Sequence, residues 1–151
     1  MIFQNEKEFE EYVRNIIQTK ITKKNSSIYS LLYSKDVDII ICKDKPKPKL
    51  FFIEVKYYKK SNGRLAFGHK EGKGFQPQIL KAIPKYYLNN LRWVLASKES
   101  EGIYFLDYNK LIEYISGNKV GSKYNNFQTR LFKEIGLSEM EFIKVLSKWI
   151  C

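Results

Sequence analysis

Residues 34–41, SKDVDIII, and residues 50–56, LFFIEVK, decide the fold of this chain. Each contains a short apolar run rich in β-branched and aromatic residues, which is typical of buried strands. Between them lies KDKPKPK, residues 43–49, whose two prolines disfavour both a helix and a central strand. We therefore predict a β-hairpin with a solvated tip.

The hairpin places acidic side chains in an apolar setting. Successive side chains on a strand point to opposite faces, so Glu54 and Lys56 share one face and Val55 points to the other. Asp38 begins the partner strand, where it can lie across from Glu54 and Lys56. Two carboxylates at one point suit a hard cation such as Mg²⁺, and the lysine beside them can orient a water. Asp36 shares the strand face of Asp38 and is the alternative ligand.

Composition favours one domain that binds a polyanion. The 151 residues include 27 Lys plus Arg against 16 Asp plus Glu, a net charge of +11. We expect an intracellular, cytoplasmic and nucleoid-associated protein without a membrane partner, because no long apolar run or signal peptide is recognisable. With two cysteines and one histidine, a disulfide framework, a zinc cluster and His-based triads are not expected.

The order of predicted elements indicates an α/β fold with a mixed central β-sheet flanked by helices. The core is assigned to residues 1–120, and residues 121–151 are expected to form a small helical C-terminal extension of the same domain, serving oligomerisation or DNA contact. A glycine-rich functional loop is expected over 57–75. The remaining predictions are helices over 6–19, 78–88, 109–115, 127–134 and 139–150, the last opened by a capping box at 138–141, and strands over 92–96 and 102–106.

The motif residues carry a resemblance to a known family. Asp38 together with Glu54-Val55-Lys56 resembles the active-site signature of the PD-(D/E)XK nucleases, although Val37 stands where the signature has its proline. Glu71-Gly72-Lys73 also fits the short pattern, but it lies among glycines without a strand. The resemblance implies a restriction-endonuclease-like core.

The resemblance also implies roles for individual residues. Mg²⁺, for which Mn²⁺ can substitute, would be held by Asp38, Glu54 and the backbone carbonyl of Val55, while Lys56 positions the attacking water. A glutamate of the first helix often joins such sites, and Glu10 completes the predicted catalytic set.

Glu10 is chosen from the acidic residues at the start of the first helix. It lies at the edge of the apolar face that Val13, Ile16 and Ile17 form, whereas Glu11 points nearly opposite that face. Which of the two glutamates takes part stays open, as does the alternative that the acidic residues of this helix simply favour its N-terminus and remain in water.

DNA contacts are predicted in the segment that follows the motif and in the C-terminal extension. The candidates are Lys59, Lys60, Arg64, His69, Lys70, Lys73, Gln76, Gln78 and Arg130.

Within the family, the chain is most similar to the intron-encoded homing endonucleases of this fold. That likeness implies a homo-oligomer, dimer or tetramer, which cuts both strands of double-stranded DNA at a long, pseudopalindromic site. A Holliday junction resolvase, which residues 34–40 resemble, and a type II restriction endonuclease are the alternative enzymes. The non-enzymatic alternative is a basic DNA-binding module in which the carboxylates and the lysine satisfy one another.

Overall fold

The structure is a computed structural model that describes residues 2–31, 37–58, 64–69, 85–98, 101–111, 124–128 and 135–151. For residues 30–31, 64–69, 85–87 and 124–128 it describes the backbone only. No helix in these ranges combines the length and the apolar character that a membrane span requires.

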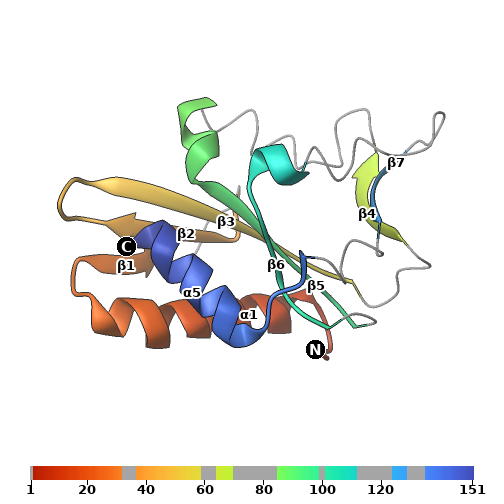
Figure 1. Cartoon of the computed structure of the whole chain (residues 1–151), viewed down its shortest axis with the longest axis horizontal. Coiled ribbons are helices and arrows are strands. Elements are labelled where there is room, and N and C mark those ends of the chain that lie inside the picture. Colours follow the sequence, from red (N-terminus) through yellow and green to blue (C-terminus); the bar gives the residue numbers. More distant parts are fainter. Residues whose placement is uncertain are drawn as a thin grey trace.

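A mixed five-stranded sheet forms the centre of the molecule (Figure 1). Its order is β1-β2-β3-β5-β6, in which β3 and β5 run parallel and the other neighbours run antiparallel. The predicted hairpin is present as β2 and β3, with Ile39 opposite Ile53 and Lys43 opposite Lys49. The strands are β1 (Ile28–Leu31), β2 (Ile39–Lys43), β3 (Lys49–Tyr58), β5 (Leu91–Ser97) and β6 (Tyr104–Leu106).

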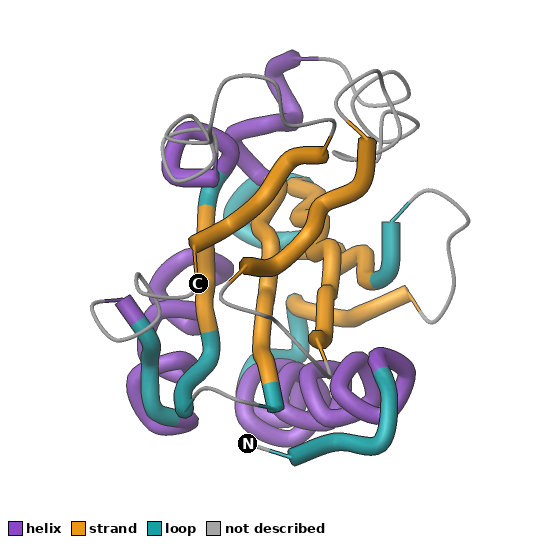
Figure 2. Tube along the Cα trace, turned by 90° about the vertical axis from the view of Figure 1, so that its right-hand side faces the viewer, coloured by secondary structure: helices purple, strands orange, loops and turns teal. Residues whose placement is uncertain are grey.

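Two helices pack on one face of this sheet. Helix α1 (Glu6–Ile16) buries Phe9, Val13 and Ile16, and it continues as a π-helix, η1 (Ile17–Ile21), and a 3-10 turn, η2 (Thr22–Lys24). Helix α5 (Glu139–Ile150) buries an apolar stripe against the same core cluster as α1. Figure 2 shows helical segments on both sides of the strands.

The α5 helix begins as the sequence predicts. The Ser138 hydroxyl accepts a hydrogen bond from the Glu141 backbone N–H at 3.3 Å, and the Glu141 carboxylate accepts one from the Ser138 N–H at 2.8 Å. This reciprocal capping box satisfies two backbone donors that a helix start otherwise leaves without partners.

The two faces of β3 have different neighbours, in agreement with the predicted alternation. Ile53 and Val55 are fully buried in the cluster that contains α1 and α5. Phe52 and Tyr58 pack in a second cluster on the opposite face, which is the face of Glu54 and Lys56. The α/β fold class, with its mixed central sheet, flanking helices and C-terminal helix, is therefore as predicted.

Two local predictions are wrong. Within the expected loop 57–75, β3 extends to Tyr58 and residues Arg64–His69 form strand β4. Strand β7 (Tyr124–Gln128) pairs with β4 and includes Phe127 and Gln128, which were expected to start a helix. The partners of this two-stranded sheet are about 60 residues apart in sequence, so local patterns do not reveal their pairing.

Several other predicted elements are described in part. The 3-10 helix η3 (Lys85–Asn90) replaces the end of the helix expected over 78–88, and residues 78–84 lie outside the described ranges. Helical residues 108–111 begin the predicted helix 109–115, whose remainder also lies outside them. The same holds for residues 129–134 of the predicted helix 127–134.

Candidate active site

The candidate site lies on the edge of β3, just beyond the end of its pairing with β2. The β2–β3 ladder ends at the pair Ile39 and Ile53, while β3 continues to Tyr58. Along one edge of a strand, only every second residue points its N–H toward the neighbouring strand. On the edge of β3 that faces β2, the next such residues after Ile53 are Val55 and Tyr57. Each needs an acceptor in place of a neighbouring strand.

Two carboxylates accept hydrogen bonds from these amides. Asp38 Oδ2 accepts from the Val55 N–H at 2.7 Å, and Glu6 Oε2 accepts from the Tyr57 N–H at 3.3 Å. Asp38 comes from the residue before β2, whereas Glu6 is the first residue of α1. The backbone of β3 therefore holds both acids beside the strand.

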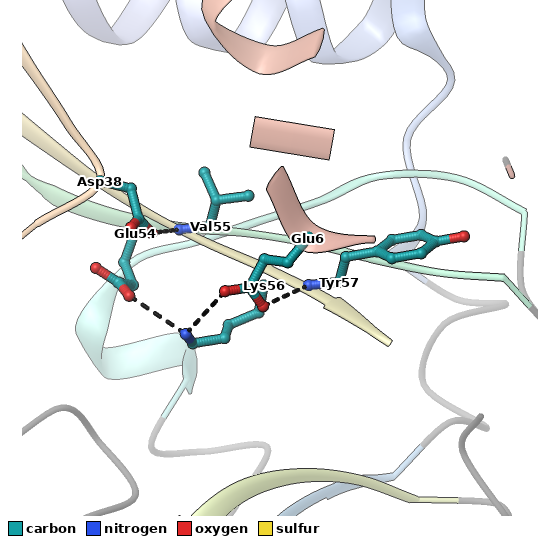
Figure 3. Close-up of polar contacts among 6 residues, drawn as sticks. All are labelled: Glu6, Asp38, Glu54, Val55, Lys56 and Tyr57. Carbon is teal, nitrogen blue, oxygen red and sulfur yellow. Dashed lines mark hydrogen bonds and ion pairs between the residues drawn. The ribbon is translucent and has the colours of Figure 1, made fainter. Parts of the chain in front are cut away.

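Lys56 lies between two further carboxylate contacts (Figure 3). Its Nζ is 3.5 Å from Glu54 Oε1 and 3.4 Å from Glu6 Oε1. The Glu54 side chain is 4% exposed and that of Lys56 is 26% exposed, so this cluster is only partly open to water. One ammonium group thus joins acids from a strand and from a helix.

The charges around Lys56 keep it protonated. Burial by itself lowers the pKa of this lysine, but the negative charges of Glu6, Glu54 and Asp38 outweigh that effect, and the pKa rises above its ordinary value. Lys56 is therefore a cation at neutral pH. It can donate hydrogen bonds and offset negative charge, but it is unsuited to act as a general base.

Asp38 has a raised pKa. The main cause is burial, which disfavours the charged carboxylate, and the nearby charge of Glu10 acts in the same direction. The Val55 N–H, Lys56 and a hydrogen bond with Glu54 lower the pKa without cancelling the rise. Acids held this close repel one another, and a bound cation would relieve that repulsion.

The structure brings Glu10 near the site but gives it a specific partner. Arg14 Nε donates to Glu10 Oε1 at 2.9 Å, and the same guanidinium donates to the backbone carbonyl of Asp38. The Glu10–Arg14 pair consequently links α1 to the start of β2. The negative charge of Glu10 raises the pKa of Asp38, so Glu10 acts on the site electrostatically. Its role in the catalytic set stays a prediction.

Glu6 is the site residue that the sequence reasoning passed over. It lies three residues before Phe9 and seven before Val13, both buried, so helical spacing places it on the inward face of α1. At about 100° per residue, Glu6 lies nearer than Glu10 to the centre of the face that Val13, Ile16 and Ile17 form, so the same helical spacing favours Glu6 over the predicted Glu10.

An aromatic cluster holds this end of α1 against β3. Phe3 and Phe9 contact the ring of Tyr57, with ring centroids 5.5 and 5.8 Å away. The Tyr57 hydroxyl also accepts a hydrogen bond from the Phe3 N–H at 2.9 Å. Because Tyr57 follows Lys56 directly and points to the helix side, this packing fixes Glu6 beside Lys56.

Most of the predicted DNA contacts cannot be placed. Arg64 and His69 lie in β4, where only the backbone is described, and His69 pairs with Tyr124. Asp36, the alternative ligand, and the other predicted contacts lie outside the described ranges, namely Lys59, Lys60, Lys70, Lys73, Gln76, Gln78 and Arg130.

Comparisons with known proteins give a likeness of fold. No family model matches the chain, and no curated protein matches its sequence. Among solved structures, it is similar to Hjc, a Holliday junction resolvase from the archaeal hyperthermophile Archaeoglobus fulgidus. The two chains are 9% identical and superpose with a TM-score of 0.48 over 93% of this chain and 98% of the other.

Proposed function

We propose that this protein is a metal-dependent endonuclease that hydrolyses phosphodiester bonds of double-stranded DNA. The observation that carries the proposal is the cluster at the end of the β2–β3 ladder. There Asp38 and Glu54 come together with Lys56, whose ammonium group is 3.5 Å from Glu54. The net charge of +11 supports a polyanionic substrate.

The donor set at this site fits Mg²⁺ or Mn²⁺. Within the described residues no group of three or more His, Cys, Asp or Glu side chains is arranged to hold a metal. Magnesium commonly takes only one or two carboxylates and completes its shell with water and substrate oxygens. Asp38 and Glu54 would hold it with the Val55 carbonyl. The bound ion would supply positive charge to the scissile phosphate and acidify a water.

The chain's own residues have separate tasks in this proposal. Asp38 and Glu54 present oxygen ligands, and the Val55 N–H keeps Asp38 in place at 2.7 Å. Lys56, protonated by its acidic surroundings, orients the attacking water and offsets the negative charge that develops on the phosphate. Glu6 gives Lys56 a second carboxylate contact, at 3.4 Å.

The specific role that we propose is that of a homing endonuclease acting as a homo-oligomer on a long site. Its support is the likeness of the sequence to that branch of the PD-(D/E)XK nucleases. A junction resolvase and a restriction enzyme are distinguished from it by substrate. Selection of cleaved duplexes from a random library with Mg²⁺ would yield a long site for homing, a short palindrome for restriction, and no linear site for a resolvase.

A non-enzymatic DNA-binding module is the second candidate, and a specific observation favours it. Asp38 and Glu6 each satisfy a backbone N–H of β3, and Lys56 pairs with two acids. Such contacts can stabilise a strand edge without chemistry.

Substitution of Lys56 separates the two candidates. We expect Lys56→Ala to lose DNA cleavage in Mg²⁺ by at least on the order of a hundredfold, because a positioned cation is lost from the transition state. Binding of the same DNA in EDTA should remain nearly unchanged. The measurement is cleavage of duplex and cruciform DNA alongside fluorescence anisotropy.

Lys7→Ala is the matched control, since Lys7 is an exposed lysine of α1. It should cleave as the wild type does. Normal cleavage by the Lys56 variant would remove the assignment. Intact DNA with the wild type, despite tight binding, would favour the module.

A further inference from the structure

Six exposed lysines lie at the end of the molecule away from the candidate site. Two exposed lysines end η2, three lie in the β2–β3 hairpin tip (residues 44–49) and one lies in the last turn of α5. We call this group the basic end; it comprises Lys23, Lys24, Lys45, Lys47, Lys49 and Lys148. By contrast, α1 and α5 both carry acidic residues in their first turns.

Three segments far apart in sequence meet to form the basic end. The Asp44 N–H donates to the Ser27 carbonyl at 2.8 Å, which joins the hairpin to the turn after η2. Lys43 Nζ donates to the carbonyl of Ile150 at 3.0 Å, which joins β2 to the end of α5. Figure 1 shows the hairpin tip, the turn between η2 and β1 and the C-terminal end of α5 at the same side of the molecule.

The preference of cations for helix C-termini accounts for only some of these lysines. Cations favour the last turn of a helix, which accounts for Lys23, Lys24 and Lys148. The hairpin lysines Lys45 and Lys47 belong to no helix. Among the described residues, the ion pairs are formed by Arg14 and Lys56, not by the basic end. Like charges held together repel, so this arrangement favours an anionic partner.

We propose that the basic end is a second DNA-binding surface, which contacts backbone phosphates away from the candidate site. The inference rests on the proposed function, because it takes DNA as the polyanion. Lys49 and Lys56 are seven residues apart on β3, which corresponds to about 23 Å at 3.3 Å per residue. That length spans about seven base pairs of B-DNA. The surface therefore lengthens the DNA footprint beyond the site of cleavage.

DNA is a better partner for this surface than an anionic membrane. The tip, residues 44–49, consists of lysine, proline and one aspartate, and all of these residues are exposed. Stable attachment to a membrane requires apolar area that enters the bilayer in addition to positive charge. Phosphate contacts along DNA require only positioned charges.

Charge-neutralising pairs test the proposal. We expect Lys45→Gln/Lys47→Gln and Lys23→Gln/Lys24→Gln each to weaken binding of a duplex of about 30 base pairs, and to lower the salt slope of log K by about one per lost phosphate contact. Binding is measured by fluorescence anisotropy in EDTA over a salt series. Lys7→Gln/Lys144→Gln removes the same charge from exposed positions on α1 and α5 and should have a smaller effect.

The outcomes are distinct from those of the cleavage experiment, because no metal and no cleavage are involved. Equal losses in all three variants would mean that net charge alone acts, and would overturn the proposal. Unchanged binding by both basic-end variants would overturn it as well. The proposal would also be overturned if the basic-end variants lost binding to phosphatidylserine vesicles but kept DNA binding. That result would assign the surface to a membrane.

Discussion

At the scale of single residues, the candidate site uses carboxylates as substitutes for a neighbouring strand. Asp38 and Glu6 accept hydrogen bonds from two alternate amides of β3, beyond the last pair with β2. The same acids act on Lys56 through their charges. The same carboxylates thus accept hydrogen bonds from the edge of β3 and supply negative charge to Lys56. The arrangement preorganises the site.

The raised pKa of Asp38 predicts a pH-dependent cost to stability. Between its ordinary value of 3.8 and its raised value in the folded protein, the folded state binds more protons than the unfolded state. The free energy of unfolding should therefore fall as pH rises through this window. Asp38→Asn removes the titration while its amide oxygen can still accept from Val55. We expect the stability of the variant relative to the wild type to increase as pH rises through this window.

Urea unfolding in EDTA at several pH values measures this difference. Asp44→Asn is the control, because Asp44 is exposed at the hairpin tip, and it should show no comparable gain. A loss of stability in the Asp38 variant that is the same at every pH would contradict the prediction. It would mean that the contacts of the carboxylate outweigh its burial.

Glu6 is predicted to act as a positioning residue through Lys56. Glu6→Gln removes a negative charge 3.4 Å from the ammonium group, and that charge helps to raise the pKa of Lys56. If protonated Lys56 is needed for cleavage, the alkaline limb of the kcat/KM profile should move to lower pH. The measurement is the pH profile of DNA cleavage in Mg²⁺.

Glu8→Gln provides the comparison, because Glu8 lies in the same helical turn, is exposed and contacts the Gln4 backbone. Its pH profile should match that of the wild type. A Glu6 variant with lower activity but an unmoved alkaline limb would show a structural role only.

At the scale of elements, β3 organises both the core and the site. Ile53 and Val55 point into the core beneath α1 and α5, while Glu54 and Lys56 lie on the opposite face. The strand pairs with β2 on one side and with β5 on the other, so its position is set along its length. Because side chains alternate along a strand, the packing of Ile53 and Val55 in the core also fixes Glu54 and Lys56 on the opposite face.

Helix α5 should unfold together with this core. Leu146 is fully buried in the cluster that includes α1 and β3. Leu146→Ala is expected to lower the free energy of unfolding by about 2–5 kcal/mol, because it removes packed atoms and leaves a cavity. Urea unfolding followed by circular dichroism and by tryptophan fluorescence should give one coincident transition.

Met140→Ala on the same helix is the control, since Met140 is 68% exposed. It should change stability little. Two separate transitions in the Leu146 variant would show that α5 forms a unit apart from the sheet, contrary to the assignment of residues 121–151 to the same domain.

At the scale of the whole molecule, the acidic helix starts and the lysines of the basic end, both within the described residues, lie at different places along the sheet. The acidic first turns of α1 and α5 contrast with the lysines of the hairpin tip and the helix ends. Both helices cover one face of the sheet, whereas Glu54 and Lys56 lie on the other face of β3. Polyanion binding at the basic end and chemistry near Glu54 can therefore occupy different parts of the molecule.

The sequence by itself determined the hairpin, the shared face of Glu54 and Lys56, the first helix and the capped C-terminal helix. These features depend on neighbours a few residues apart, where alternation, helical periodicity and capping are visible in the chain. Only the tertiary structure decided that β4 pairs with β7 and that Glu6 reaches Lys56 across 50 residues. Contacts between distant segments depend on how whole elements pack, and no local pattern encodes that packing.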